Sequence, residues 1–131
     1  MKTALLDLTL ACVVGIVQSC NPFSPDQSVT LGVAQLEAPA TIVAGTPLSV
    51  VLTVELGGCK SFERIVTERT PQHATLTVLG SDASKGRDVS CPTNYFTEPH
   101  TVQLDPPFSN PFTITVNRGR VSPLTATVQV Q

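Results

Sequence analysis

The sequence predicts an all-β domain over residues 28–131, built as a two-sheet antiparallel sandwich of about seven strands. Thr and Val are the commonest residues of this part, and both favour strands. Apolar and polar residues alternate with a period of two in several segments, which is the pattern of a half-buried strand. All eleven prolines come after residue 20, and they divide these segments with turns.

Residues 1–19 have the pattern of a secretory signal peptide. A mostly apolar stretch begins at Ala4, close behind Lys2, and residues 8–17 carry no charge. An apolar run of this length fits the hydrophobic region of a signal peptide and is too short to span a bilayer. We therefore expect a helical leader that is removed, and a mature protein that works outside the cytoplasm.

Residues 17–20, Val-Gln-Ser-Cys, resemble the lipobox of bacterial lipoproteins. The resemblance implies cleavage before Cys20, a diacylglycerol on its thiol, and anchoring to a membrane of the bacterial cell envelope. An ordinary secretory leader is the alternative, because Val17 and Ser19 also suit the small-residue rule of the general signal peptidase. Residues 20–27 would then be a polar tether, of which residues 21–27 reach roughly 25 Å when fully extended.

The cysteine count supports the same interpretation. Cys12 would leave with the leader, so an odd number of cysteines remains in the mature chain, namely Cys20, Cys59 and Cys91. Lipid on Cys20 would leave Cys59 and Cys91 to form a disulfide, which an oxidising compartment permits. That bridge closes a loop of about 33 residues and would add roughly 3–4 kcal/mol. Two unpaired buried thiols are the alternative, and no second Cys or His stands at a usual zinc spacing.

The first half of the domain shows the clearest strand pattern. Alternation begins at Ser28 and places Val29, Leu31 and Val33 on one face. Residues 38–47 form an extended stretch that ends in a turn. The strongest strand covers residues 48–56, and Gly57-Gly58 ends it. Its inward residues are predicted to be Leu48, Val50, Leu52, Val54 and Leu56.

Residues 61–70 fit either a strand or a helix. A helix would align Phe62, Ile65, Val66 and Arg69 on one face. The β-branched run at residues 65–67 and the nearby Pro71 favour a strand. Four charged residues of this segment are expected on a solvated face with cross-strand ion pairs, which discourage edge-to-edge aggregation. They are Glu63, Arg64, Glu68 and Arg69.

The second half continues the strand pattern with longer interruptions. Residues 73–79 form a strand with Ala74, Leu76 and Val78 inward, and residues 80–90 form the longest charged loop, pinned by Cys91. Residues 101–104 form a short strand. The last two strands meet in a hairpin near Gly119, which is free to adopt positive φ. Their inward residues are predicted to be Phe112, Ile114, Val116, Leu124, Ala126, Val128 and Val130.

Two segments carry a family resemblance. Residues 38–48, Ala-Pro-Ala-Thr-Ile-Val-Ala-Gly-Thr-Pro-Leu, resemble the opening of many bacterial extracellular immunoglobulin-like domains. Residues 58–62, with Arg69 and Cys91 further on, are similar to small exported domains of that type. The resemblance implies an immunoglobulin-like sandwich over residues 28–131 that serves as an adhesive, scaffolding or spacer unit. The core tryptophan of antibody domains has no counterpart, and the Cys59–Cys91 bridge is expected to staple a surface region.

Several function classes find little support in the residues. The chain has 8 basic and 10 acidic residues and no basic stripe for nucleic acid. His73 and His100 are expected to be surface residues, and no Gly-x-Ser-x-Gly motif provides a nucleophile. Asp82 and Asp88 are the only candidate calcium ligands in one loop, and calcium usually takes more. We expect no catalysis, no metal and no cofactor.

These patterns together predict a non-catalytic, membrane-tethered lipoprotein that acts as an interaction or structural module of the bacterial cell envelope. The alternative is an inhibitor or binding protein, since some small immunoglobulin-like proteins insert end loops into the cleft of a protease. The candidate loops are residues 57–61, 80–90 and 117–123. A small hydrolase or metal-dependent enzyme that uses His73 and His100 is a third, weaker hypothesis.

Overall fold

The computed structural model describes residues 28–86 and 88–131, so the predicted signal peptide and tether lie outside the described residues. Within this part the chain is all-β, with nine strands and no helix, and therefore no helix that could span a membrane. The strands are β1 (Ser28–Thr30), β2 (Val33–Glu37), β3 (Thr41–Ile42), β4 (Leu48–Gly57), β5 (Lys60–Arg69), β6 (His73–Asp82), β7 (Tyr95–Leu104), β8 (Phe112–Arg118) and β9 (Val121–Val130).

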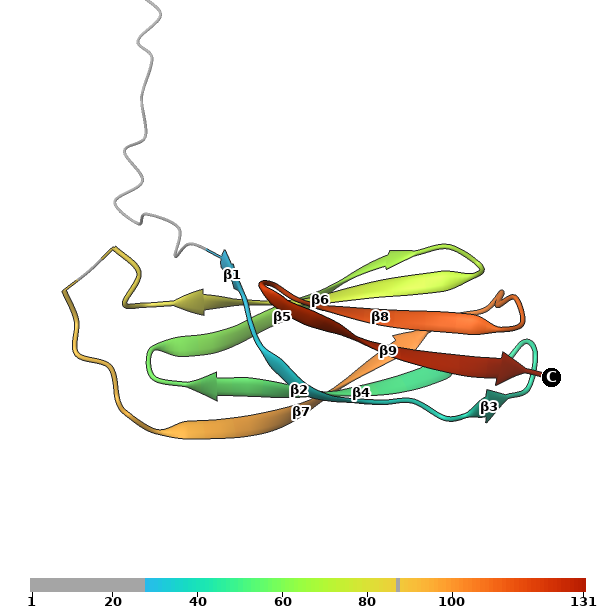
Figure 1. Cartoon of the computed structure of the whole chain (residues 1–131), viewed down its shortest axis with the longest axis horizontal. Helices are drawn as coiled ribbons and strands as arrows, with labels where there is room; N and C mark the ends of the chain where they lie inside the picture. The colour runs from blue at the N-terminus through green and yellow to red at the C-terminus, as the bar shows by residue number, and fades with distance from the viewer. Residues whose placement is uncertain (1–27, 87) are drawn as a thin grey trace, which may run out of the picture.

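The strands form one curled, mixed sheet in the order β2-β4-β5-β6-β8-β9-β3 (Figure 1). Strand β7 pairs with β4, and β1 pairs with β6 beside the end of β8. Most pairs are antiparallel, but β6 with β8 and β3 with β9 are parallel. Within the described chain, β4 and β5 share one pair, Gly57↔Lys60 at their hairpin, so they diverge after the turn. The wholly antiparallel pairing that the sequence predicted is thus replaced by a mixed one.

The core lies inside the curl of the sheet. Every predicted inward residue of β4, β6 and β8 is buried, because strict alternation aims one face of each strand at the others. These residues are Leu48, Val50, Leu52, Val54, Leu56, Ala74, Leu76, Val78, Phe112, Ile114 and Val116. Burial of each large one stabilises the fold by roughly 1.5–3 kcal/mol. In β9 only Val128 is buried, whereas Leu124 and Val130 are half-buried against the core and Ala126 is half-buried.

Strand β5 confirms the choice of strand over helix for residues 61–70, but the predicted cross-strand ion pairs are wrong. The residues of β6 that lie opposite the charged residues of β5 carry no charge. Arg64, Glu68 and Arg69 face Leu79, Thr75 and Ala74. Glu63 lies at a shift in the register, and its carboxylate is 3.8 Å from the guanidinium of its neighbour Arg64. The reason is that the acidic residue of β6, Asp82, stands at its last position, opposite Lys60, and no Asp, Glu, Lys or Arg precedes it in the strand.

Two predicted boundaries also need correction. Strand β7 begins at Tyr95 and not at residue 101, and it pairs with β4 along its whole length. Pro99 hid this extension, because proline removes a ladder donor and argues against a central strand. The charged loop begins after Asp82 and not at residue 80, because β6 continues far enough to face Lys60. The strand predicted from Ser28 is divided into β1 and β2, and the extended stretch contains the short strand β3, so the number of strands rises from about seven to nine.

Candidate functional site

Three connections lie on the same side of the molecule, because β4, β6 and β8 run toward one end and β5, β7 and β9 run away from it (Figure 1). They are the β4–β5 hairpin, the loop between β6 and β7, and the β8–β9 hairpin. We call the end formed by Ser28 with residues 55–61, 82–86 and 88–96 the stapled end. The β8–β9 hairpin is set back from it. Asn117 lies opposite Thr77, whereas Lys60 lies opposite Asp82, about 16 Å further along β6.

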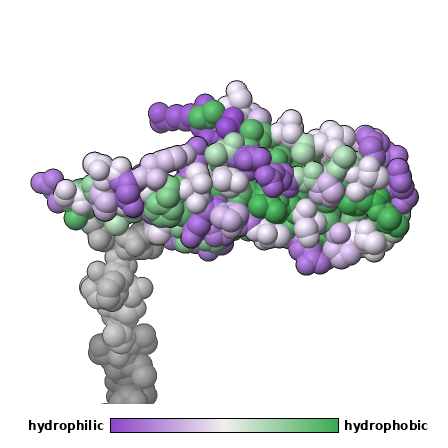
Figure 2. Space-filling model, turned by 90° about the horizontal axis from the view of Figure 1, so that it is seen from below, coloured by the Kyte–Doolittle hydropathy of each residue, from purple (hydrophilic) through white to green (hydrophobic). Residues whose placement is uncertain are grey.

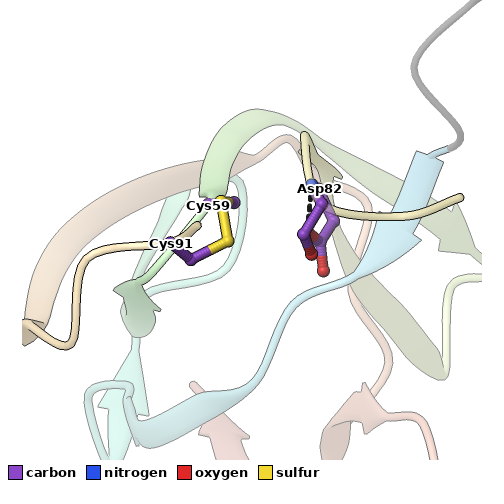
Figure 3. Close-up of a disulfide and its surroundings, with 4 residues drawn as sticks. Cys59, Asp82 and Cys91 are labelled. Atoms are coloured by element: carbon purple, nitrogen blue, oxygen red, sulfur yellow. Dashed lines mark hydrogen bonds between the residues drawn. A yellow bond between two sulfur atoms is a disulfide. The ribbon is translucent and has the colours of Figure 1, made fainter. Parts of the chain in front are cut away.

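A disulfide joins Cys59 of the hairpin to Cys91 of the long loop, with their Cα atoms 5.2 Å apart (Figure 3). Both cysteines are half-buried, so the bridge staples a surface region, as predicted. Gly57 makes this approach possible. Its φ is 140°, and a Cβ there would lie 2.2 Å from the backbone oxygen of Asn94. Disulfides are typical of oxidising compartments, so the bridge points to an extracytoplasmic location.

Backbone and side-chain hydrogen bonds hold the long loop on the hairpin. Gly58 N–H donates to the oxygen of Asn94 over 3.1 Å, and Ala83 N–H donates to the oxygen of Cys59 over 3.0 Å. The Asp82 carboxylate accepts from the hydroxyl and the backbone N–H of Ser84. These hydrogen bonds, the hydroxyl first, lower the pKa of Asp82 below its ordinary value. Asp82 therefore shapes the turn.

The calcium candidates are not brought together as a ligand cluster. Asp88 is exposed in the same loop as Asp82. Across the described residues, no three His, Cys, Asp or Glu side chains gather as a metal site would require.

A shallow pocket of about 220 Å³ lies at the stapled end. It is lined by Gly32, Glu55, Leu56, Gly57, Lys60, Asn94 and Tyr95. The Tyr95 hydroxyl donates to the Glu55 carboxylate over 3.0 Å. This hydrogen bond, then desolvation and the charge of Glu55, raises the pKa of Tyr95 above its ordinary value. The pocket is smaller than the roughly 300–1,000 Å³ of typical small-molecule sites.

The sequence did not single out Glu55 or Tyr95 as site residues. Alternation placed Glu55 on the wet face of its strand, and Tyr95 stood outside every predicted strand. One signal was available, because Tyr95 is the only tyrosine of the chain. A lone tyrosine has no pattern around it, however, so only the pairing of β7 with β4 brings it to Glu55.

The two histidines lie on different strands and each bonds a neighbour on its own strand. His73 shares a 3.0 Å hydrogen bond with the hydroxyl of Thr75. His100 lies 3.2 Å from the carboxylate of Glu98 and stacks on the ring of Phe62, with 3.8 Å between ring centroids. His73 is exposed, whereas His100 is half-buried by this stacking. The arrangement gives both histidines structural contacts.

Exposed apolar side chains mark the stapled end. Val89, Tyr95 and Phe96 are 50%, 67% and 45% exposed. The narrow end on the left of Figure 2 carries hydrophobic and hydrophilic residues side by side, whereas the wider part has a hydrophobic band between hydrophilic borders. Val43, at 65% exposure, lies next to β3 at the opposite end of the molecule.

Chemically, the stapled end offers a covalently braced surface with an aromatic hydroxyl, a carboxylate and an ammonium group around a small hollow. Such a surface suits contact with a partner, since its groups are positioned by one hydrogen bond and one disulfide. No family model, curated protein or solved structure matches this chain.

Proposed function

We propose that this protein is an exported, non-catalytic lipoprotein that a lipid on Cys20 tethers to a membrane, and that it serves as an interaction or structural module of the bacterial cell envelope. The lipobox-like residues 17–20 and the apolar leader support export and lipidation. The braced stapled end supports a role as a contact surface without catalysis, because its pocket of about 220 Å³ is smaller than typical small-molecule sites.

The single observation that carries this proposal is the Cys59–Cys91 bridge. It supports an extracytoplasmic location, because disulfides persist in oxidising compartments. It also accounts for two of the three cysteines that remain after the leader is cut. The third cysteine of an exported protein would be a reactive thiol unless it were modified, and a thioether-linked lipid would modify Cys20 in this way.

We also propose that the curled sheet is an immunoglobulin-like sandwich. One layer would hold β2, β4 and β7, and the other would hold β5, β6, β8 and β9. The divergence of β4 and β5 after one shared pair supports this division, as does the core enclosed between them. Nuclear Overhauser contacts would test it, since side chains of β4 and β8 should meet across the core while no backbone hydrogen bonds join these two strands.

Metabolic labelling with a fatty acid tests the tether. The Cys20→Ala variant should lose the label, whereas the matched variant Cys12→Ala should keep it because Cys12 lies inside the leader. Intact mass under reducing and non-reducing conditions should show cleavage before Cys20, added acyl chains and one internal bridge. Label retained by Cys20→Ala would contradict the tether.

The second candidate function is that of an inhibitor or binding protein that uses its end loops. The observation that favours it is that two of the candidate connections, the β4–β5 hairpin and the loop between β6 and β7, are joined at one end of the molecule by the disulfide. Titration against a panel of proteases tests it. Full protease activity at micromolar concentrations of this protein would exclude that function for the panel.

A further inference from the structure

We infer that the stapled end faces the membrane and touches lipid through Val89, Tyr95 and Phe96. This inference rests on the proposed lipid at Cys20 and adds what the tether does not specify, namely which end of the domain meets the bilayer. The opposite end, with β3 and Val43, would then point away from the membrane.

The first argument is where the chain leaves the folded domain. Ser28, the first residue of β1, lies opposite Ser81 and so beside the β5–β6 pair at the stapled end. Residues 20–27 reach at most about 29 Å when fully extended, whereas a ten-residue strand such as β4 is about 33 Å long. The tether is thus shorter than the domain, and it keeps the stapled end close to the lipid.

The second argument is the chemistry of the exposed side chains at this end. Tyr95 and Phe96 begin β7, and Val89 precedes the stapled Cys91 by two positions. All three are about half exposed or more. Aromatic side chains favour the bilayer interface, where the ring meets acyl chains and a hydroxyl such as that of Tyr95 meets water and headgroups.

The third argument is charge. The described residues of the stapled end carry two basic groups, Lys60 and Lys85, and three acidic groups, Glu55, Asp82 and Asp88. This end therefore offers no basic patch that would attract anionic lipid headgroups. Contact would depend on the apolar side chains and not on lipid charge.

The absence of tryptophan from the sequence permits a clean test. The full lipidated chain is made as Phe96→Trp and, as the matched control from the opposite end, Val43→Trp. Each is reconstituted into phosphatidylcholine vesicles with bromine atoms on the acyl chains, which quench tryptophan on contact. Interfacial side chains sink about 5–10 Å into the headgroup boundary. Emission of Phe96→Trp should therefore fall by roughly half, while Val43→Trp stays unquenched.

Other outcomes would overturn the inference in distinguishable ways. If the mass shows acylated Cys20 but Phe96→Trp is unquenched, this inference fails and the tether stands. If Cys20 carries no lipid, the proposed tether fails and this inference falls with it. A blue shift of the tryptophan emission that depends on protein concentration and not on vesicles would show that the exposed apolar side chains of the stapled end contact a second copy of the chain. Tyr95→Trp gives a second probe should Phe96→Trp lose its β-rich circular dichroism.

Discussion

At the residue scale, two side chains obtain their roles from partners far away in the chain. Tyr95 binds Glu55, forty residues earlier. Arg69 donates to the oxygen of Pro107 and lies over the rings of Phe108 and Phe112, at 4.4 and 5.1 Å from their centroids. Neither pairing follows from local sequence. The first comes from the pairing of β4 with β7, and the second from the packing of the β7–β8 connection and the start of β8 against the end of β5.

The raised pKa of Tyr95 can be measured directly, because this is the only tyrosine and the chain has no tryptophan. Ultraviolet titration of the folded protein should give a midpoint above the ordinary 10.0, and titration in urea should return it to that value. The neutral form is favoured in the fold. The stabilising contribution is therefore present below the unfolded pKa and is lost as the pH rises through the folded pKa.

The matched variants for this titration are Glu55→Gln and Glu98→Gln. Glu55→Gln removes the charge beside the hydroxyl, so the Tyr95 midpoint should move back toward 10.0. Glu98→Gln changes a carboxylate on the same strand as Tyr95 and should leave the midpoint unchanged. Equal shifts in both variants would contradict the assignment of the pKa change to the Glu55 hydrogen bond.

Arg69 should contribute measurably to stability. Removing its guanidinium in Arg69→Ala loses the cation–π contacts and the hydrogen bond to Pro107, which we expect to lower the free energy of unfolding by about 2 kcal/mol. Arg69→Lys should retain only part of the stability that Arg69→Ala loses, because an ammonium lacks the planar face of a guanidinium. The side chain of Arg64 is 62% exposed, so Arg64→Ala should change the free energy of unfolding by less than about 0.5 kcal/mol. Urea denaturation checks all three, and equal losses in Arg64→Ala and Arg69→Ala would contradict this role.

At the scale of elements, the edge strands are protected from pairing with other chains. Within the described chain β7 pairs only with β4, so its other side is a free edge. Pro99 stands at the middle of this edge, opposite Thr53. Proline fits there because it has no N–H to offer, and its position breaks the row of outward donors. On β5 the exposed charges of Glu63, Arg64 and Glu68 serve the same purpose.

Replacing Pro99 should open this edge. The Pro99→Thr variant restores an outward N–H in a ten-residue strand, so we expect copies of the protein to associate through β7. Sedimentation velocity at increasing concentration should show larger species than the wild type forms. Thr97→Ser, on the same edge, is the control and should sediment as the wild type does. Identical sedimentation of Pro99→Thr and wild type would rule out a protective role for the proline.

At the scale of the whole molecule, the fold depends on contacts between distant parts of the chain. The core joins residues from Leu31 to Val128, and β6 pairs with β1, β5 and β8. The disulfide closes a segment with a sequence separation of 32 that contains β5, β6 and the long loop. It therefore restricts the unfolded chain over a third of the β domain, far from the centre of the core.

Removing the bridge should cost stability without changing the fold. The double variant Cys59→Ser/Cys91→Ser should unfold with about 3–4 kcal/mol less free energy, by the loop-closure argument. Far-UV circular dichroism should stay β-rich, because none of the fully buried core residues is touched. Cys20→Ser is the control and should unfold as the wild type does. A loss below about 1 kcal/mol would show that the bridge restricts little of the unfolded chain.

The sequence by itself determined the strand-forming segments and their inward faces, from Leu48 to Val116, because alternation is a local property that each strand carries alone. It also pointed to the glycine turns and to the Cys59–Cys91 pair. The tertiary structure decided the partners: the parallel pairing of β6 with β8, the full length of β7 and the meeting of Glu55 with Tyr95. An alternating pattern does not specify which strand will be the neighbour or whether it runs parallel or antiparallel. The strand pairing is therefore decided only when distant segments pack around one core.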